Sequence, residues 1–298
     1  MTNICYVKKS FRGKTLALIE QAVKLIAEYQ AQGYDLTLRQ LFYAHVSRNL
    51  LPNTERSYKL LGDVVNDGRL AGLIDWNSIV DRTRHVRENN HWSGPAEIVR
   101  ACAQQFQINK WAGQKKRVIV LIEKDALIGV IEPVCRKLDT PCLSCRGYTS
   151  QTEMWNLGQR LLGWAQDRGA TPVVLHLGDH DPSGIDMSRD IEERLQLFLN
   201  GVPFEFDRLA LNMHQVKQYK PPPNPAKLTD SRCGGYTAKY GDKSWELDAL
   251  EPKVLSELVR SNTLKHLDSK LYNQRVKEEE AHRATLSDAA TEMEKGKD

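Results

Sequence analysis

The sequence predicts an α/β fold in two parts, a small helical part followed by a larger part built on a parallel sheet. Apolar residues recur at helical spacing through roughly the first 71 of the 298 residues. From residue 118 onward, short apolar runs alternate with helical segments, which is typical of a parallel sheet covered on both faces. The charge changes at the same place: residues 1–117 contain 18 Lys and Arg against 10 Asp and Glu, whereas the remainder contains 24 against 28. A basic first part and an acidic second part indicate a phosphate-binding region joined to a carboxylate-bearing one.

The first part is expected to contain three helices. The first covers residues 14–31, and Gly33 ends it. Thr37 and Gln40 form a capping box that opens the second helix, because the Thr hydroxyl and the Gln amide each satisfy a free backbone N–H. A third helix is expected at roughly 55–71.

The second helix presents Tyr43 away from its apolar side. At 100° per residue, Tyr43 lies about 140° from Leu38 of the apolar stripe, and Arg39 lies one turn earlier on the same flank. This position argues against burial of Tyr43. With the short aromatic segment 73–84, which predicts a small β element, the three helices are typical of a winged-helix or helix-turn-helix DNA-binding domain over 1–92. A small helical domain with ordinary surface charge fits the same pattern.

The second part is expected to be a Rossmann-like parallel sheet. Strands are expected at 118–122, 141–145 and 172–177, with helices at 126–138, 151–168 and 183–199. A linking helix occupies 93–116, and the sheet domain with a C-terminal extension covers 117–273. Within it, residues 220–244 are rich in Pro, Gly and basic residues and predict a long basic loop. Residues 274–298 are polar and predict a fraying helix or a loose tail.

Acidic residues stand where the predicted strands end. Glu123 follows the first strand, and Asp179 and Asp181 follow the third. In an open parallel sheet, ligands bind at the carboxyl ends of the strands, so these side chains are expected to lie close together. Three such carboxylates favour a hard divalent cation and predict a site for Mg²⁺, with Mn²⁺ as a substitute. The alternative is that Asp181 only caps the next helix, which Pro182 opens, and that Glu123 is a surface acid.

Several classes of protein are excluded by what the sequence lacks. The longest notable apolar run, 118–122, is too short to span a bilayer, and residues 1–10 contain no secretory signal. Six scattered cysteines predict reduced thiols, and a cytoplasmic location is expected. A glycine-rich phosphate loop followed by Lys and Ser or Thr is missing, so nucleotide hydrolysis within the chain is not expected.

Together these residues resemble a known family. Glu123, the segment Arg146-Gly147-Tyr148 and the segment Asp179-His-Asp181-Pro-Ser-Gly184 are similar to the Toprim domain of topoisomerases, primases and some nucleases. With Leu38-Arg39-Gln40-Leu41-Phe42-Tyr43 upstream and Trp245-Glu-Leu-Asp-Ala-Leu250 downstream, the chain resembles the A subunit of topoisomerase VI and its meiotic double-strand-break relative. In its short length it resembles the minimal, stand-alone A-like proteins of bacterial mobile elements.

The resemblance implies a fold, an activity and partners. The fold would be a winged helix followed by a Toprim domain, and the activity would be Mg²⁺-dependent DNA cleavage by tyrosine transesterification. Tyr43 would be the nucleophile, and Glu123, Asp179 and Asp181 would hold the metal. The implied partners are DNA, a second copy whose metal meets the first copy's tyrosine, and a separate GHKL-type ATPase B-like subunit. The implied setting is the nucleoid of a bacterium, with the protein bacterial or encoded by a phage or plasmid.

In this mechanism Arg39 would stabilise the phenolate or grip the phosphate, and DNA affinity would come from phosphate contacts rather than base recognition. The candidate contacts are basic side chains of both parts: Arg48, Arg82, Arg84, Arg87, Lys124 and Arg146. Two other functions remain open. A Toprim metallonuclease would hydrolyse DNA with water and would not need Tyr43, and a non-catalytic DNA-binding or assembly protein would use the sheet only as a scaffold.

Overall fold

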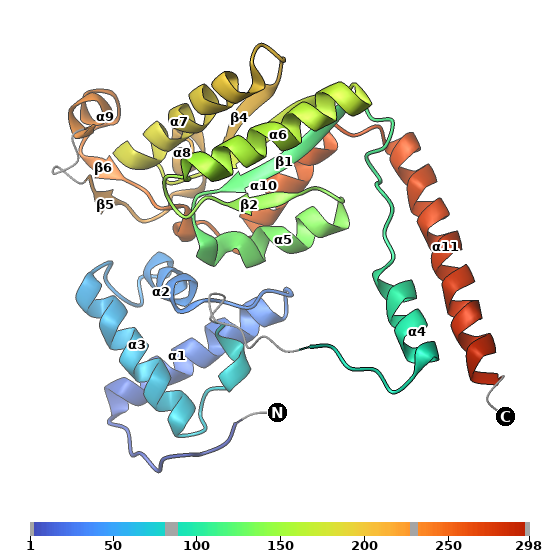
Figure 1. The fold of residues 1–298 in the computed structure, drawn as a ribbon. Helices are drawn as coiled ribbons and strands as arrows, with labels where there is room; N and C mark the ends of the chain where they lie inside the picture. The colour runs from blue at the N-terminus through green and yellow to red at the C-terminus, as the bar shows by residue number, and fades with distance from the viewer. Residues whose placement is uncertain (1–2, 81–88, 227–231, 296–298) are drawn as a thin grey trace.

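The chain folds into an N-terminal helical unit and a sheet domain, with a pair of helices beside them (Figure 1). This structure, a computed structural model, describes residues 3–80, 89–226 and 232–295. The helical unit contains α1 (Gly13–Gln30), α2 (Leu38–Ser47), α3 (Glu55–Leu70) and the short 3-10 helix η1 (Trp76–Ser78). The three α-helices expected from the sequence are confirmed, with ends that agree to about two residues.

Local signals determine where these helices begin and end. Thr37 Oγ1 accepts the Gln40 N–H at 3.3 Å, and the Gln40 side chain accepts the Thr37 N–H at 2.9 Å, so the predicted capping box is formed. Gly33 ends α1 with a φ of +83°, in the left-handed region that favours glycine. An apolar core joins the helices, and its largest fully buried members are Ile19, Leu36, Leu41, Leu61 and Ile74.

The β element expected in the first part is small. Leu36 and Ile79 form an isolated parallel bridge, and the intervening aromatic segment turns as the 3-10 helix η1. Within residues 3–80 no β-hairpin follows the three helices. Residues 81–84 of the expected β segment lie outside the described residues.

Four parallel strands form the sheet, in the order β2–β1–β3–β4. They are β1 (Lys116–Ile122), β2 (Cys142–Ser144), β3 (Thr171–Leu177) and β4 (Glu205–Ala210). The parallel α/β architecture and the three predicted strands are therefore confirmed. β4 is not among the predicted strands, because an edge strand needs no continuous apolar run, and Glu205, Asp207 and Arg208 interrupt its apolar residues.

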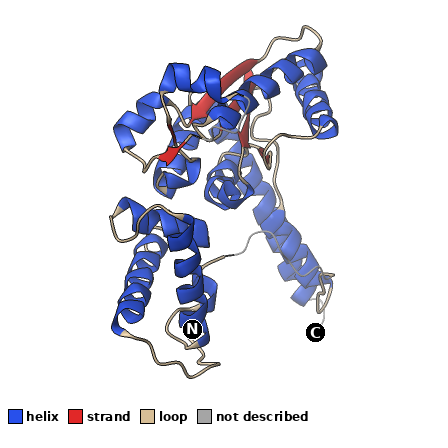
Figure 2. Cartoon of the chain, turned by 90° about the vertical axis from the view of Figure 1, so that its left-hand side faces the viewer, coloured by secondary structure: helices blue, strands red, loops and turns tan. Residues whose placement is uncertain are grey.

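Helices cover both faces of the sheet, and Figure 2 shows the strands enclosed by them. On one face lie α5 (Ile128–Lys137), entered through the 3-10 helix η2 (Asp125–Leu127), and α10 (Pro252–Leu264). On the other face lie α6 (Gln151–Arg168) and α7 (Pro182–Leu199). No helix in the described parts of the chain combines the length and the apolar character that crossing a membrane requires.

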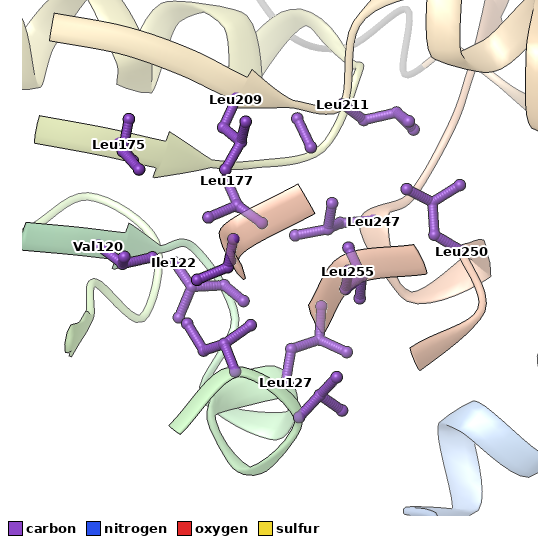
Figure 3. Packing of buried hydrophobic residues seen from close by; sticks show 14 of the residues in the cluster. Val120, Ile122, Leu127, Leu175, Leu177, Leu209, Leu211, Leu247, Leu250 and Leu255 are labelled. Carbon is purple, nitrogen blue, oxygen red and sulfur yellow. The ribbon is translucent and has the colours of Figure 1, made fainter. Parts of the chain in front are cut away.

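Two apolar cores result from the alternation of side chains along the strands. In β1, Val120 and Ile122 face the core under α5 and α10, whereas Leu121 faces the core under α6 and α7. Figure 3 shows the first of these cores, in which Leu127 and Leu247 lie beside the strand side chains. The 3-10 helices at the carboxyl edge of the sheet are therefore anchored by apolar packing.

A segment rich in Pro and Gly connects β4 to α10. Its elements are α8 (Met213–Tyr219), β5 (Asn224–Pro225), α9 (Cys233–Tyr240), β6 (Lys243–Ser244) and the 3-10 helix η3 (Leu247–Ala249). The expectation of a long loop over 220–244 is wrong in part, because β5 pairs with β6 and α9 is helical. Buried Cys233 and Tyr236 hold α9 in place, and such tertiary packing overrides the weak helix propensity of its two glycines.

The helices α4 (Pro95–Gln105) and α11 (Ser269–Lys295) lie side by side at one end of the molecule (Figure 1). Lys110 Nζ lies 3.0 Å from Glu279 Oε2, and both side chains are largely buried. Of the two alternatives expected for residues 274–298, a helix is present through Lys295 and a loose tail is wrong, because α11 is continuous across the boundary drawn after residue 273. Its polar composition reflects a helix that buries only a narrow side.

Candidate active site at the carboxyl edge of the sheet

The structure brings Glu123 and Asp179 together at the carboxyl edge of the sheet. Glu123 directly follows β1, and Asp179 follows β3 after Gly178. Glu123 Oε2 accepts the backbone N–H of Asp179 at 2.8 Å. Both acids are buried, so neither is an ordinary surface carboxylate.

Asp181 caps α7 beside them. Its Oδ1 accepts the Gly184 N–H at 2.6 Å, and Pro182 occupies the first helical position. Gly184 packs so closely under the acidic turn that a Cβ there would lie 2.3 Å from the backbone oxygen of Asp179. The capping role considered for Asp181 is therefore present, and it uses only one of the two carboxylate oxygens.

The turn formed by residues 179–181 is also fixed by hydrogen bonds to residues 245–247, at the start of η3. His180 and Trp245 exchange backbone hydrogen bonds of 2.8 and 2.9 Å. Asp179 Oδ1 accepts the Leu247 N–H at 2.7 Å, and Arg208 of β4 donates to the backbone oxygen of Asp179. Contacts on both sides therefore fix the direction of the Asp179 carboxylate.

Burial and mutual repulsion act on these acids. Burial raises the pKa of Glu123 to about 7, and the charges of Asp179 and Asp181 add to the rise. Burial likewise raises the pKa of Asp179 to about 6, although Lys124 opposes that rise. The carboxylates are thus close enough to disfavour one another's ionisation, and a cation beside them would relieve this cost.

The donor atoms of this edge fit a hard divalent cation. Glu123 Oε1 and Asp181 Oδ2 accept no hydrogen bond from the described residues. Within residues 3–80, 89–226 and 232–295, no three His, Cys, Asp or Glu side chains are arranged to hold a metal ion by themselves. Mg²⁺ keeps several waters and is commonly held by one or two carboxylates, so the oxygens Glu123 Oε1 and Asp181 Oδ2 are the candidate direct ligands.

Lys124 lies among carboxylates at the same edge. Its Nζ is 2.9 Å from Asp179 Oδ2, 2.8 Å from Asp248 Oδ2 and 3.0 Å from Glu246 Oε2. Burial lowers the pKa of Lys124, but these three charges outweigh burial and raise it. The side chain is 20% exposed and faces the acids, so Lys124, expected from the sequence to contact DNA, is paired with carboxylates in the free protein.

Arg39 and Tyr43 of α2 meet the same acids from the helical unit. Arg39 Nη2 lies 2.6 Å from Glu246 Oε2, and Arg39 Nε lies 3.2 Å from Asp248 Oδ2. Tyr43 lines one pocket with Glu246 and Asn224, and burial and the charge of Glu246 both raise the pKa of Tyr43. Glu246 and Asp248, which both pair with Arg39 and Lys124, therefore join the helical unit to the charged edge of the sheet.

Tyr43 is buried, with 5% of its surface exposed. The expectation drawn from its place off the apolar stripe is wrong, because η3 packs against a second side of α2. Burial raises the pKa of Tyr43 to about 12, and the Glu246 charge adds to the rise. Burial also raises the pKa of Glu246, but Lys124 and Arg39 outweigh burial and lower it to about 2, so Glu246 is ionised at neutral pH.

A pocket of about 420 Å³ opens beside Tyr43. Its lining combines aromatic and polar side chains, among them Arg39, Phe42, Asn53, Tyr58, Asn224 and Glu246. Pockets of this size and mixed lining hold small organic ligands. Tyr43, Arg39 and Glu246 therefore share the wall of one pocket large enough for part of a nucleotide.

Two other predicted DNA contacts, Arg48 and Arg146, do not line this pocket. Arg48 Nη2 pairs with Glu28 at 2.8 Å on the helical unit. Arg146, 74% exposed, follows β2 and pairs with Asp125 at 3.1 Å. Arg82, Arg84 and Arg87 lie outside the described residues.

Sequence reasoning assigns no role to Glu246, Asp248 and Asn224, which complete the site. Asp248 is fully buried, and its Oδ1 has no hydrogen-bond partner in the described parts of the chain. Residues 245–250 do contain a sequence pattern that indicates buried acids, because Glu246 and Asp248 stand among Leu247 and Leu250. Carboxylates in so apolar a segment require cationic partners once the segment is buried.

A scan against protein-family models finds no match to this chain, and no curated protein matches it. The geometry of the site therefore carries the functional argument.

Proposed function

We propose that this protein cleaves DNA by Mg²⁺-dependent transesterification through Tyr43, as a type IIB topoisomerase A-subunit-like enzyme. The strongest support is that Tyr43 lines one pocket with Arg39 and Glu246, and that Lys124 connects Glu246 to Asp179. A tyrosine, two cations and an acidic strand edge thus form one continuous polar cluster. Phosphoryl transfer to a tyrosine needs a nucleophile, cations for the phosphate and carboxylates for a metal, and this cluster contains each of them.

In the proposed reaction the Tyr43 oxygen attacks a DNA phosphorus atom. A bond forms between that oxygen and phosphorus, and the bond from phosphorus to one sugar oxygen breaks. The products are a phosphotyrosine and a free hydroxyl end, so the break is reversible. The phenol proton passes to solvent, and the departing sugar oxygen takes up a proton.

Arg39 is the residue placed to favour the phenolate. Burial raises the pKa of Tyr43, but the Arg39 charge lowers it. Its guanidinium also has the fork of N–H donors that suits phosphate oxygens. In the proposed mechanism Arg39 therefore acts on both the nucleophile and the substrate.

Glu123 and Asp181 would hold Mg²⁺, with Asp179 behind them. The ion, when bound, would supply charge stabilisation to the scissile phosphate and the leaving oxygen. Because ligands must be ionised and burial raises the pKa of Glu123 to about 7, metal affinity should increase as the pH rises through neutrality.

The wider assembly belongs to the same proposal. The basic helical unit would bind DNA as a winged helix, and the parallel sheet would serve as a Toprim domain. A homodimer, a GHKL-type ATPase B-like subunit and a location at the bacterial nucleoid would complete the system. In the single chain Tyr43 faces acids of its own subunit, so an exchange of tyrosines between subunits would require the two parts to separate.

Trapping of a covalent adduct tests the transesterase. Supercoiled DNA is incubated with the protein and Mg²⁺ or Mn²⁺, quenched with detergent, and examined for DNA joined to protein. Wild type is compared with Tyr43→Phe and with Tyr29→Phe, because Tyr29 is also buried and lies against the sheet domain, where it donates to the carboxylate of Glu251. An adduct is expected with wild type and Tyr29→Phe, and none with Tyr43→Phe.

A hydrolytic Toprim nuclease is the second candidate, and the burial of Tyr43 favours it. A phenol with a pKa of about 12 is a poor nucleophile at neutral pH, whereas water beside Glu123 and Asp181 needs no tyrosine. Cleavage of equal rate by wild type and Tyr43→Phe, without an adduct, would establish hydrolysis. Loss of that cleavage in Asp181→Asn would assign it to this site.

A further inference from the structure

We propose that the Glu246 carboxylate occupies the place of a DNA phosphate, and that Arg39, Lys124 and Asn224 form an oxyanion site which the protein fills with its own side chain until DNA displaces it. We refer to these three residues as the phosphate seat. The inference rests on the proposed function, since it identifies where the phosphate attacked by Tyr43 would bind.

The contacts of Glu246 are those of a bound oxyanion. Its Oε2 lies 2.6 Å from Arg39 Nη2 and 3.0 Å from Lys124 Nζ. Its Oε1 accepts from Asn224 Nδ2 at 3.3 Å. A guanidinium, an ammonium and an amide N–H converging on one group are the donors by which proteins bind phosphate.

The nucleophile candidate lies beside the same group. Tyr43 and Glu246 line one pocket, and burial and the Glu246 charge both raise the pKa of Tyr43, so an oxyanion in the seat would lie near the Tyr43 oxygen. Attack on phosphorus requires this proximity. The seat therefore has the position that a reacting phosphate needs.

The net charge of the cluster is unchanged when a phosphodiester replaces Glu246. Arg39 and Lys124 face three carboxylates, those of Asp179, Glu246 and Asp248. Without Glu246, two cations face two carboxylates. A phosphodiester carries one negative charge, so its entry restores the arrangement that the free protein already accommodates.

Glu246 is also the member of the cluster that is free to move. The Asp248 side chain is 0% exposed and that of Asp179 is 8% exposed, with Asp179 held by the Leu247 N–H. The Glu246 side chain is 24% exposed and lines the pocket beside Tyr43. Its longer side chain can rotate into that pocket, while the two aspartates remain fixed by the fold.

The affinity of the seat for DNA is therefore reduced by an internal competitor. Binding of a phosphate must break the contacts of Glu246 with both cations before it forms its own. Removing the charge of Glu246 should expose the seat and tighten DNA binding, whereas adding a carboxylate there should weaken it.

Fluorescence anisotropy of a labelled DNA duplex, in buffer containing a chelator so that no cleavage occurs, measures this affinity. Glu246→Gln is expected to bind about tenfold more tightly than wild type, the effect of about one charge-assisted hydrogen bond. Glu251→Gln is the matched control: it removes the same charge from the same segment, and Glu251 joins the two units through Tyr29 without contacting Arg39 or Lys124. Its affinity should stay within about twofold of wild type.

Adding Arg39→Ala to Glu246→Gln should abolish the gain. Equal affinities of Glu246→Gln and Glu251→Gln, or a gain that persists without Arg39, would overturn the phosphate seat. If Glu246→Gln does not fold, Asn224→Asp keeps an acceptor for the Asn53 amide, which lies 2.6 Å away, and should weaken duplex binding several-fold. Unchanged binding by Asn224→Asp would also overturn it.

The two proposals fail separately. A tenfold gain in Glu246→Gln without any covalent adduct in wild type would retain the seat as a DNA-binding site and reject the transesterase. An adduct on Tyr43 without a gain in Glu246→Gln would retain the transesterase and reject the seat.

Discussion

Lys124→Met is the substitution that tests the buried ion cluster most directly, because Met retains most of the side-chain length and removes the charge. Lys124 Nζ lies 2.8–3.0 Å from three carboxylates. Two of them, on Glu246 and Asp248, keep Arg39 as a partner at 2.6 and 3.2 Å. The third, on Asp179, is left as a buried charge without an ion pair among the described residues, since Arg208 contacts only the backbone oxygen of Asp179.

An unpaired buried charge costs about 3–5 kcal/mol, and we expect the free energy of unfolding at pH 8 to fall by that amount. Protonation of Asp179 limits the loss at lower pH. Burial raises its pKa to about 6 in the wild type, and removing Lys124 raises it further. When a carboxyl group has a higher pKa in the folded than in the unfolded state, the protein loses stability as the pH rises from the unfolded pKa to the folded one. The deficit of the variant should therefore shrink between pH 8 and pH 5, by at most about 1.4 kcal/mol per pH unit.

Urea unfolding followed by circular dichroism at both pH values measures these differences, with Lys116→Met as the control. Lys116 pairs with Glu205 at 2.6 Å, but the two side chains are 38% and 44% exposed. Loss of such an exposed pair should cost less than about 1 kcal/mol at either pH. Equal losses in the two variants, or a Lys124→Met deficit that is the same at pH 5 and pH 8, would refute the reasoning.

Three further predictions concern neighbouring residues. Burial lowers the pKa of His176 to about 3, so the unfolded chain binds a proton below about pH 6.5 that the folded protein excludes, and stability falls as the pH drops through this range. His176→Asn should reduce this loss of stability with falling pH. The measurement is the urea midpoint at pH 7 and at about pH 4.5, and an equal change between the two pH values in wild type and variant would contradict the prediction. Asp181→Asn should keep the α7 cap and abolish metal-dependent cleavage, whereas Asp181→Ala should in addition lower the free energy of unfolding by about 1 kcal/mol. Cleavage by Asp181→Asn at the wild-type rate would exclude a metal-binding role for Asp181. Gly184→Ala should lower stability by about 1–3 kcal/mol, since its Cβ would lie 2.3 Å from a backbone oxygen. Gly234→Ala is the control, because Gly234 is helical and a Cβ there would have nothing within 4 Å; it should be neutral or stabilising. Equal melting temperatures of the two variants in thermal unfolding would reject the steric argument.

Much of the fold could be predicted because its signals are local. The capping box at Thr37 and the apolar run of β1 are each contained in a few residues, and the structure has both. β4 and α9 could not be predicted in the same way. An edge strand with charged residues and a helix with two glycines both depend on partners supplied by the rest of the fold.

In the site, too, some residues could be placed from local sequence signals, whereas others depend on tertiary packing. Glu123 and Asp179 follow predicted strands, so the sheet topology alone brings them together. The contacts of Tyr43 and Lys124 depend on η3, whose position relative to α2 is a matter of tertiary packing. Helical spacing describes which side of α2 faces its own unit, and it contains no information about a second surface that covers the opposite side.

The pairing of α4 with α11 has a consequence for synthesis of the chain. Arg100 and Glu294, which lie 2.6 Å apart across this pair, are separated by 194 residues. The whole sheet is translated between them, so α4 emerges from the ribosome long before the helix that covers its apolar side. During that interval the buried side of α4, which includes Ala96 and Ala103, remains open to other nascent chains or to chaperones. The pair formed by α4 and α11 is therefore the last part to assemble. A chain that ended before α11 would have a complete sheet and an α4 whose apolar side is uncovered.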